Sequence, residues 1–407
     1  MGDKVLIFLI GTNPLPNYIV GRYLKENYNK FVLIYSEEKK EINQYSTSGY
    51  AEKLNEHLNL NSDCILLPLS DISNPKVIKK DLEQKLKFPE KNIDEVHLNY
   101  TGGTKAMVVH IYNFLKDKFK DKFKGSYLDA KLNKLILDDG TTQEISDTFL
   151  DVKTLIYIHL YKILNHYTFE NYKYREESSD QKVFDEIFNE IKSEIETGNG
   201  ANIVSILKKQ GNGSYADGLY ENFFKNRVKN HDEKKVKHVI TTTEKVKEPF
   251  LSGGFWLEWY VYLQLREKIK EKLKNKNFKE GEQFGLNLKA KKLNVNISND
   301  FELDIFIIYN SKLTGISITK GDNQGDCKLK GFEVIHRVKQ IGGDESKAIL
   351  VTGLKKEYEN EINRGTKKLQ EDLSFVTGTD EDKIIVFGID DWPYIGSKIY
   401  EGVFKWY

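Results

Sequence analysis

Short apolar runs alternate with amphipathic stretches over the first third of the chain. The apolar runs span residues 4–10, 31–35, 64–68 and 95–99. Helical spacing of apolar positions follows each of them, at 16–27, 48–58, 76–86 and 105–116. A hairpin-like pair, 125–129 and 134–137 around Asn133, closes the unit. Continuous apolar runs are typical of parallel strands buried on both faces, so residues 1–146 are predicted to form an α/β domain with a doubly wound, mostly parallel sheet.

The pattern changes twice after this unit. Residues 147–250 are predicted to be a helical, charged connecting region, with helices at 151–166, 180–197 and 216–229 and a solvated linker at 225–247. Residues 251–407 are predicted to be a second α/β domain. Its expected strands are 286–297, 302–309, 313–319, 348–352 and 383–387, and its expected helices are 256–268, 327–340 and 357–373. The strands on either side of Asn310-Ser311 are expected to pair as an antiparallel hairpin.

Composition narrows the class of protein. Of the 407 residues, 39% are hydrophobic and 12% aromatic, which is enough apolar surface to fold. No run approaches the roughly 18 apolar residues of a membrane helix, and the first apolar run lacks a signal-peptide cleavage pattern, so we expect a cytoplasmic protein with no membrane partner. The two cysteines, Cys64 and Cys327, fall in different predicted domains, which disfavours a disulfide framework and excludes zinc sites built on cysteine pairs.

The net charge argues against binding of nucleic acid by the protein surface as a whole. Lysine and arginine total 62 against 61 acidic residues, a net charge of +1. Nucleic acid is therefore not held by a globally basic surface, and any such partner requires a local patch or a conformational change.

Three loops follow predicted strands at the edge where ligands bind such sheets: 11–17, 35–38 and 100–105. The third reads Tyr100-Thr101-Gly102-Gly103-Thr104-Lys105. Paired glycines allow close backbone approach, and a helix N-terminus favours anions. The loop matches neither the Walker nor the dinucleotide motif. A tight turn with a capped helix is the alternative interpretation.

The Thr-Gly-Gly-Thr-Lys loop, paired with Gly-Thr-Asn after the first strand, resembles the CARF domain of CRISPR-associated proteins. The resemblance implies a Rossmann-like domain that dimerises and binds cyclic oligoadenylates, here cyclic tetra-adenylate, across a two-fold axis. It also implies a ligand cradle lined by residues of all three loops: Thr12, Asn13, Ser36, Thr101, Gly102, Gly103, Thr104 and Lys105.

The second domain carries carboxylates and a lysine on neighbouring predicted strands. Glu302 and Asp304 share one face of their strand, and Ile318 and Lys320 share a face of the next. Ser317 and Thr319 are expected to point to the opposite face if the strand is regular, whereas a β-bulge there would change the face. An exposed polar face of a hairpin is the alternative interpretation.

This arrangement resembles the active site of PD-(D/E)xK nucleases of the restriction-endonuclease kind. The resemblance implies a divalent metal, Mn²⁺ or Mg²⁺, held by Asp304 and Glu302, and a lysine, Lys320, that positions or activates the attacking water. Hard oxygen ligands suit these ions. Glu258, on the Gly-Phe-Trp-Leu-Glu helix before the strands, stands where such enzymes place an accessory carboxylate that is also a metal ligand and a catalytic residue.

The order of motifs is similar to that of the CARF-fused PD-(D/E)xK nucleases of type III CRISPR systems. The resemblance includes Gly342-Gly343 before a hydrophobic strand. It implies a homodimeric endonuclease, activated by cyclic oligoadenylate, that cleaves DNA and/or RNA in antiviral defence.

One position departs from the nuclease pattern. The acid expected at position 318 is an isoleucine, which cannot bind a metal. Glu302, Glu333 or a backbone carbonyl near Ile318 or Thr319 are the candidate replacements. The departure leaves open a second class of function, a ligand-binding regulator whose nuclease fold has lost catalysis.

Overall fold

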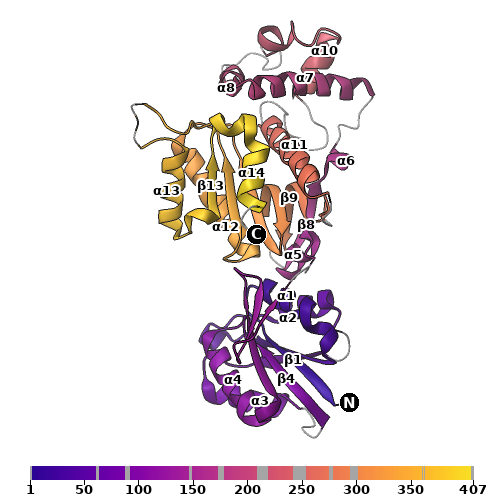
Figure 1. Ribbon diagram of the computed structural model, residues 1–407, viewed down its shortest axis with the longest axis vertical. Helices are drawn as coiled ribbons and strands as arrows, with labels where there is room; N and C mark the ends of the chain where they lie inside the picture. Colours follow the sequence, from indigo (N-terminus) through magenta and orange to yellow (C-terminus); the bar gives the residue numbers. More distant parts are fainter. Residues whose placement is uncertain are drawn as a thin grey trace.

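The computed structural model describes residues 2–60, 64–87, 92–145, 149–172, 178–208, 219–241, 254–274, 278–293, 301–359, 361 and 363–404. Figure 1 shows three parts along the long axis: an N-terminal sheet with its helices, a second sheet with its helices, and the helices α7, α8 and α10 at the far end. No described helix is both long enough and apolar enough to span a membrane.

The first sheet has seven strands in the order β3-β2-β1-β4-β5-β6-β7. Their bounds are β1 Asp3–Leu9, β2 Lys30–Ser36, β3 Cys64–Leu69, β4 Ile93–Asn99, β5 Phe123–Asp129, β6 Lys134–Leu137 and β7 Thr142–Glu144. The strands from β3 to β5 pair in parallel, and β6 and β7 add antiparallel strands at one edge. The predicted α/β domain with its hairpin around Asn133 is therefore confirmed.

Helices cover both faces of this sheet. They are α1 Leu15–Leu24, α2 Ser48–Leu58, α3 Pro75–Lys85 and α4 Lys105–Phe119, with short 3₁₀ turns η1 Lys25–Asn27, η2 Lys40–Ile42 and η5 Lys120–Lys122. Alternate residues of β1 enter different cores, because side chains alternate along a strand. Leu6 and Phe8 pack with α1 and α2, whereas Val5 and Ile7 pack with α3 and α4.

The second sheet has six strands in the order β13-β12-β11-β10-β9-β8. Their bounds are β8 Tyr161–Tyr167, β9 Phe284–Lys292, β10 Phe301–Tyr309, β11 Lys312–Ile318, β12 Lys347–Val351 and β13 Ile384–Phe387. The strands β8 to β11 pair antiparallel, and β11 to β13 pair in parallel. The predicted hairpin turn is confirmed at Asn310 and Ser311, with φ of 49° and 60°.

Two pairs of helices cover the second sheet. They are α11 Phe255–Lys272 with α14 Ile395–Phe404, and α12 Gln324–Gly342 with α13 Thr366–Thr377. The 3₁₀ turns η7 Glu381–Lys383 and η8 Ile389–Tyr394 flank β13. Trp256 and Trp259 on α11 are buried in the core of this domain. Predicted helix 357–373 is wrong at its start, because α13 begins only after Gly365, whose φ is 121°.

The connecting region differs most from its prediction. It contains α5 Val152–Ile158, α6 Phe169–Tyr172, α7 Ser178–Glu196, α8 Gly200–Lys208, the π-helix η6 Tyr220–Phe224 and α10 Glu233–Thr241. The helix expected over 151–166 is wrong in its second half. It stops at α5, the chain turns at Leu160 with φ of 64°, and the next residues form β8. That strand gains its hydrogen bonds from β9, a partner distant in sequence.

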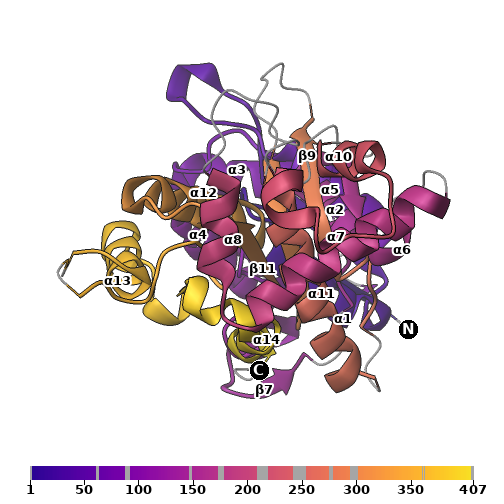
Figure 2. The same ribbon diagram turned by 90° about the horizontal axis from the view of Figure 1, so that it is seen from above.

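The expected solvated linker at 225–247 is wrong at α10, although most of residues 225–235 are exposed. Val236, Val239 and Ile240 on α10 are fully buried, because an amphipathic helix turns these sparse apolar positions to one side. Figure 2 shows α7, α8 and α10 lying over the second domain. Residues 242–250 and the first three residues of predicted helix 216–229 lie outside the described residues.

The two sheet domains touch through their turns. Lys312 Nζ donates to the Lys131 carbonyl oxygen at 2.8 Å, and Asn133 Nδ2 donates to the Asn310 carbonyl oxygen at 3.0 Å. A single cluster of buried apolar side chains also extends from the α1–α2 face of the first sheet, through α5, to the α12 face of the second. The turn of the β10–β11 hairpin is therefore held by the N-terminal domain.

Candidate functional site

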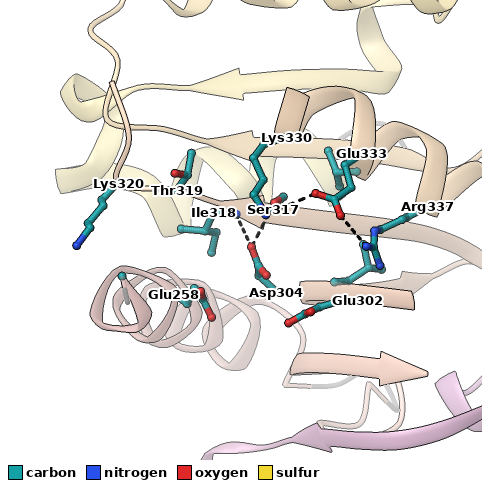
Figure 3. Close-up of a pocket in the computed structure, with 13 residues that line it drawn as sticks. Glu258, Glu302, Asp304, Ser317, Ile318, Thr319, Lys320, Lys330, Glu333 and Arg337 are labelled. Carbon is teal, nitrogen blue, oxygen red and sulfur yellow. Dashed lines mark hydrogen bonds and ion pairs between the residues drawn. The ribbon is translucent and has the colours of Figure 1, made fainter. Parts of the chain in front are cut away.

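One pocket of about 360 Å³ lies beside the end of the β10–β11 hairpin that is opposite its turn, between α11 and α12. It brings together Glu258, Glu302, Asp304 and Lys320, the four residues that the sequence assigned to catalysis (Figure 3). These side chains come from a helix, a strand and the loop after the next strand. The pocket is completed by Gly254, Leu303, Ser317, Ile318, Thr319, Lys330, Glu333, Val334 and Arg337.

Asp304 occupies the interior of this pocket. Its Oδ2 accepts hydrogen bonds from the Ile318 backbone N–H at 2.6 Å and from the Ser317 hydroxyl at 3.3 Å. Burial raises the pKa of Asp304 to about 6, and the hydrogen bond from Ile318 opposes this rise. Among the described residues Oδ1 accepts no hydrogen bond. Asp304 is thus a partly desolvated carboxylate with one oxygen still available to a ligand.

Ile318 contributes its backbone rather than its side chain. The residue is 7% exposed and its side chain belongs to an apolar core of this domain, while its N–H donates to Asp304. Ser317 was expected on the opposite face, yet its hydroxyl reaches Asp304, and Thr319 also lines the pocket. The alternation along β11 is nevertheless kept, because Ile316 and Ile318 enter one core and Ser317 does not. Asp304 lies on the Ser317 side, since the hairpin register pairs Ile305 with Ile316.

The other two carboxylates lie in different surroundings. Glu302 Oε1 forms an ion pair with Lys289 Nζ at 3.1 Å, and its side chain is 42% exposed. Glu258 is in the first turn of α11, which starts after Gly254 with φ of 92°, a conformation that favours glycine. Glu258 faces the pocket and is half-buried.

Lys320 follows β11 in a loop that the backbone fixes. The Gly353 N–H donates to the Gly321 carbonyl oxygen at 2.8 Å, and a Cβ added to Gly353 would lie only 2.4 Å from the Lys320 carbonyl oxygen. This close approach requires glycine at 353. In Figure 3 the Lys320 side chain extends away from Asp304.

Two pocket cations were missed by the sequence analysis. Lys330 and Arg337 lie on α12 on either side of Glu333, and all three face the pocket. Glu333 Oε1 is 2.6 Å from Arg337 and Glu333 Oε2 is 3.5 Å from Lys330. Their spacing along α12, three and then four residues, was a usable signal because such positions share a helix face.

The residues of the pocket fit one kind of metal site and not another. In the described part of the chain, no three His, Cys, Asp or Glu side chains lie close enough together to hold an ion. The residues that the structure describes therefore do not form a site of three carboxylates. Mg²⁺ commonly keeps several waters and binds through one or two carboxylates. Asp304, with its available oxygen, and Glu258 fit that simpler type.

A second pocket, of about 410 Å³, lies at the loop before α4. It is lined by Tyr100, Thr101, Gly102, Gly103, Lys105, Val108 and Val109. A Cβ on Gly102 would lie 2.2 Å from the Leu9 carbonyl oxygen, and one on Gly103 would lie 2.8 Å from Leu9 Cβ. The glycines therefore let this loop pack directly on the end of β1.

The hydroxyls of this loop have structural partners. Thr104 caps α4, its Oγ1 accepting the Met107 N–H at 3.3 Å, and Thr101 Oγ1 accepts the Leu128 N–H at 2.7 Å. Thr104 is exposed but does not line the pocket. Both the capped-turn interpretation and the ligand-loop interpretation are compatible with this geometry.

The remaining predicted ligand residues lie outside the second pocket. Thr12 is exposed, and the buried Ser36 donates its hydroxyl to the Tyr45 carbonyl oxygen at 2.7 Å. Asn13 Oδ1 accepts the Leu15 N–H at 3.1 Å and lies 3.2 Å from Nε2 of His159, at the C-terminal end of α5. The first loop is nevertheless adjacent to the third, since a Cβ added to Gly11 would lie 3.4 Å from the Gly103 nitrogen.

Asn17 is a buried residue of this region that the sequence analysis did not name. Its Nδ2 donates to the Leu9 carbonyl oxygen at 3.2 Å. Its Oδ1 has no hydrogen-bond partner among the described residues and would be 2.7 Å from a Cβ on Gly102. Asn17 thus joins the first and third loops at the end of β1.

With this geometry in place, comparison with known proteins identifies the first domain. Residues 5–153 match the family model of the Card1 CARF domain. The N-terminal domain is accordingly called the CARF-like domain below. No curated protein matches this sequence.

Two solved structures are similar to the chain over nearly its whole length. One is Can2 from Sulfobacillus thermosulfidooxidans in complex with cyclic tetra-adenylate, with 18% identity, a TM-score of 0.58 and 99% of each chain covered. The other is protein VC1899 from Vibrio cholerae, with 16% identity, a TM-score of 0.60 and coverage of 98% of this chain and 97% of the other. At these identities the similarity shows a shared fold over nearly the whole chain.

Proposed function

We propose that this protein is a cyclic-oligoadenylate-activated, metal-dependent nuclease of type III CRISPR defence. The observation that carries the proposal is the gathering of Glu258, Glu302, Asp304 and Lys320 around one pocket. These four residues were selected from the sequence as a nuclease site, and they come from three separate elements. An accidental polar face of a hairpin gives no reason for Glu258 of α11 to join them.

The proposed activator is cyclic tetra-adenylate. The match of residues 5–153 to the Card1 CARF domain supports this, as does the fold shared with Can2, whose structure holds cyclic tetra-adenylate. The pocket at Gly102, Gly103 and Lys105 offers backbone amides and a cation to a phosphate. A homodimer would present two copies of these loops to a two-fold cyclic ligand.

Asp304 and Glu258 would hold a Mg²⁺ or Mn²⁺ ion in the C-terminal pocket. Such an ion supplies charge stabilisation to the scissile phosphate and acidifies a bound water. The chain provides the surroundings: the Ile318 N–H and the Ser317 hydroxyl hold the Asp304 carboxylate, and the Ile318 side chain lies in the neighbouring apolar core. The pocket cations offer partners for the phosphates of a DNA or RNA strand.

A second candidate function is a ligand-binding regulator without catalysis. It is favoured by Ile318 standing where an acid is expected and by the lack of three clustered ligands among the described residues. The two functions share the CARF-like domain and differ only in the output of the second domain.

Cleavage assays distinguish the two. The purified full-length protein is incubated with Mn²⁺ or Mg²⁺ and labelled single-stranded DNA, duplex DNA or RNA, with and without cyclic tetra-adenylate. Nuclease function predicts cleavage that depends on both ligand and metal and that is lost in Asp304→Asn. Tight binding of cyclic tetra-adenylate with no cleavage of any substrate would favour the regulator.

A further inference from the structure

The C-terminal pocket has a lysine at each of two sides, and the two differ in direction. Lys330 reaches from α12 toward Asp304, whereas Lys320 extends from the loop after β11 away from it (Figure 3). Both line the same pocket. The lysine selected from the sequence is therefore not the one directed at the central carboxylate.

The course of the backbone explains why Lys330, and not Lys320, points toward Asp304. Strand β11 ends at Ile318, whose N–H is bound to Asp304, and the chain then leaves the sheet. The packing of Gly353 on the Lys320 carbonyl oxygen fixes the start of that loop. Helix α12 returns over the pocket and presents Lys330, Glu333 and Arg337 on one face.

The charge of Lys330 is available to a substrate. Its partner Glu333 is shared with Arg337, which makes the shorter contact, 2.6 Å against 3.5 Å. The Lys330 side chain is 52% exposed. Its positive charge also acts on Asp304 and lowers the pKa of that carboxyl, opposing the effect of burial.

We propose that Lys330 is a further catalytic residue, whose ammonium contacts the scissile phosphate beside Asp304. The assignment rests on the proposed nuclease function. The ammonium contributes positive charge where negative charge grows in the transition state, and the proposed role includes no proton transfer by this residue. Lys320 then has at most a secondary role in binding the nucleic acid backbone.

Four full-length variants test the assignment: Lys330→Met, Lys330→Arg, Lys320→Met and Lys328→Met. Lys328 is the matched control, because it lies on the same helix, outside the pocket, and pairs with Asp372 at 3.0 Å. Cleavage is measured with Mn²⁺, cyclic tetra-adenylate and fluorescein-labelled oligonucleotides. We expect Lys330→Met to lower kcat about 100-fold with little change in KM, as for loss of one transition-state donor. Lys330→Arg should recover part of this loss, Lys320→Met should lose less than about tenfold, and Lys328→Met should match the wild type.

The assignment is overturned if Lys330→Met cleaves as fast as Lys328→Met, or if Lys320→Met shows the larger loss of kcat. In either case the nuclease function itself stands. If the wild type cleaves no substrate, the nuclease function fails. Fluorescence anisotropy of the same oligonucleotides in EDTA then decides whether Lys330 contacts phosphate. Binding that Lys330→Met weakens about fivefold or more, and Lys328→Met does not, supports the contact; equal binding, or none, removes it.

Discussion

The cavity before α4 and the pocket beside β10 and β11 are similar in size, about 410 and 360 Å³, but their walls differ in kind. The first is formed mainly by one continuous loop, whose glycines pack on the backbone of β1. The second is formed by charged side chains from a strand, two helices and a loop. A contiguous loop is held in place by backbone contacts. Substitutions there should therefore alter ligand binding by displacing the loop. A pocket assembled from distant elements should respond to the loss of single charges.

The largest expected effect is on the charged pocket. Asp304→Asn removes the central carboxylate charge, and we expect ligand-stimulated cleavage to fall by about 10³-fold or more. Because an amide oxygen can still accept the Ile318 N–H, the fold should persist. Turnover with Mn²⁺ measures the effect, and calorimetry with cyclic tetra-adenylate should show unchanged binding. Loss of ligand binding in this variant would contradict the separation of the two sites.

The same substitution should raise stability. The pKa of Asp304 in the fold, about 6, lies above its ordinary value of 3.8, so ionisation is unfavourable in the metal-free fold. The destabilisation develops as pH rises from about 4 through 6 and is complete above that range. We expect Asp304→Asn to be more stable than the metal-free wild type at pH 7.5, by on the order of 1–3 kcal/mol, and equal to it at pH 4. Urea unfolding in EDTA at both pH values provides the measurement.

In the cavity before α4, ligand binding should be sensitive to the size of the side chain at position 102. In Gly102→Ala the new Cβ would lie 2.2 Å from the Leu9 carbonyl oxygen, so the loop must shift. We expect cyclic tetra-adenylate binding to weaken about tenfold or more and stability to fall by about 1–3 kcal/mol. Gly140→Ala is the control, since a Cβ there meets no atom within 4 Å. Its φ of 83° adds local strain only, and ligand binding should be retained. Equal binding by Gly102→Ala and the wild type would exclude the loop as a ligand contact.

The smallest expected effect on cleavage comes from a substitution at the contact between the two domains. Lys312→Met removes the hydrogen bond to the Lys131 carbonyl oxygen at the contact of the two turns. We expect stability to fall by about 1–2 kcal/mol, because a part-buried acceptor loses its donor, and stimulation of cleavage by the ligand to fall only a few-fold. Lys131→Ala is the matched control, as it keeps the carbonyl. Stimulation ratios at saturating ligand compare the two variants, and identical ratios would show that this contact does not couple the domains.

The sequence was most informative about features formed by residues that are contiguous in the chain. The apolar strand runs and the Gly102-Gly103 turn identified the first sheet and its loop, because both are contiguous in the chain. The carboxylates of β10 and the early position of Glu258 could be selected in the same way. Lys330 could not, since only the return of α12 over the sheet places it beside Asp304.

The errors share a cause. Strand β8 was expected to be helical because its hydrogen-bond partner, β9, lies more than 100 residues later and leaves no local signal. Likewise, α10 was expected to be solvated because its few apolar residues find partners only on distant helices. Ser317 reaches Asp304 because the hairpin register places these two residues opposite each other, and the sequence pattern alone does not give that register.

The position of β8 has a practical consequence for dividing the molecule. This strand forms one edge of the second sheet but precedes the helices α7, α8 and α10 in the chain. A fragment beginning at residue 251 would therefore lack an edge strand, and the backbone groups of β9 would be exposed to pairing with other chains. Such a fragment is expected to aggregate, and its inactivity would say nothing about the chemistry of the pocket. A cut placed just before β8, after α5, keeps all six strands together.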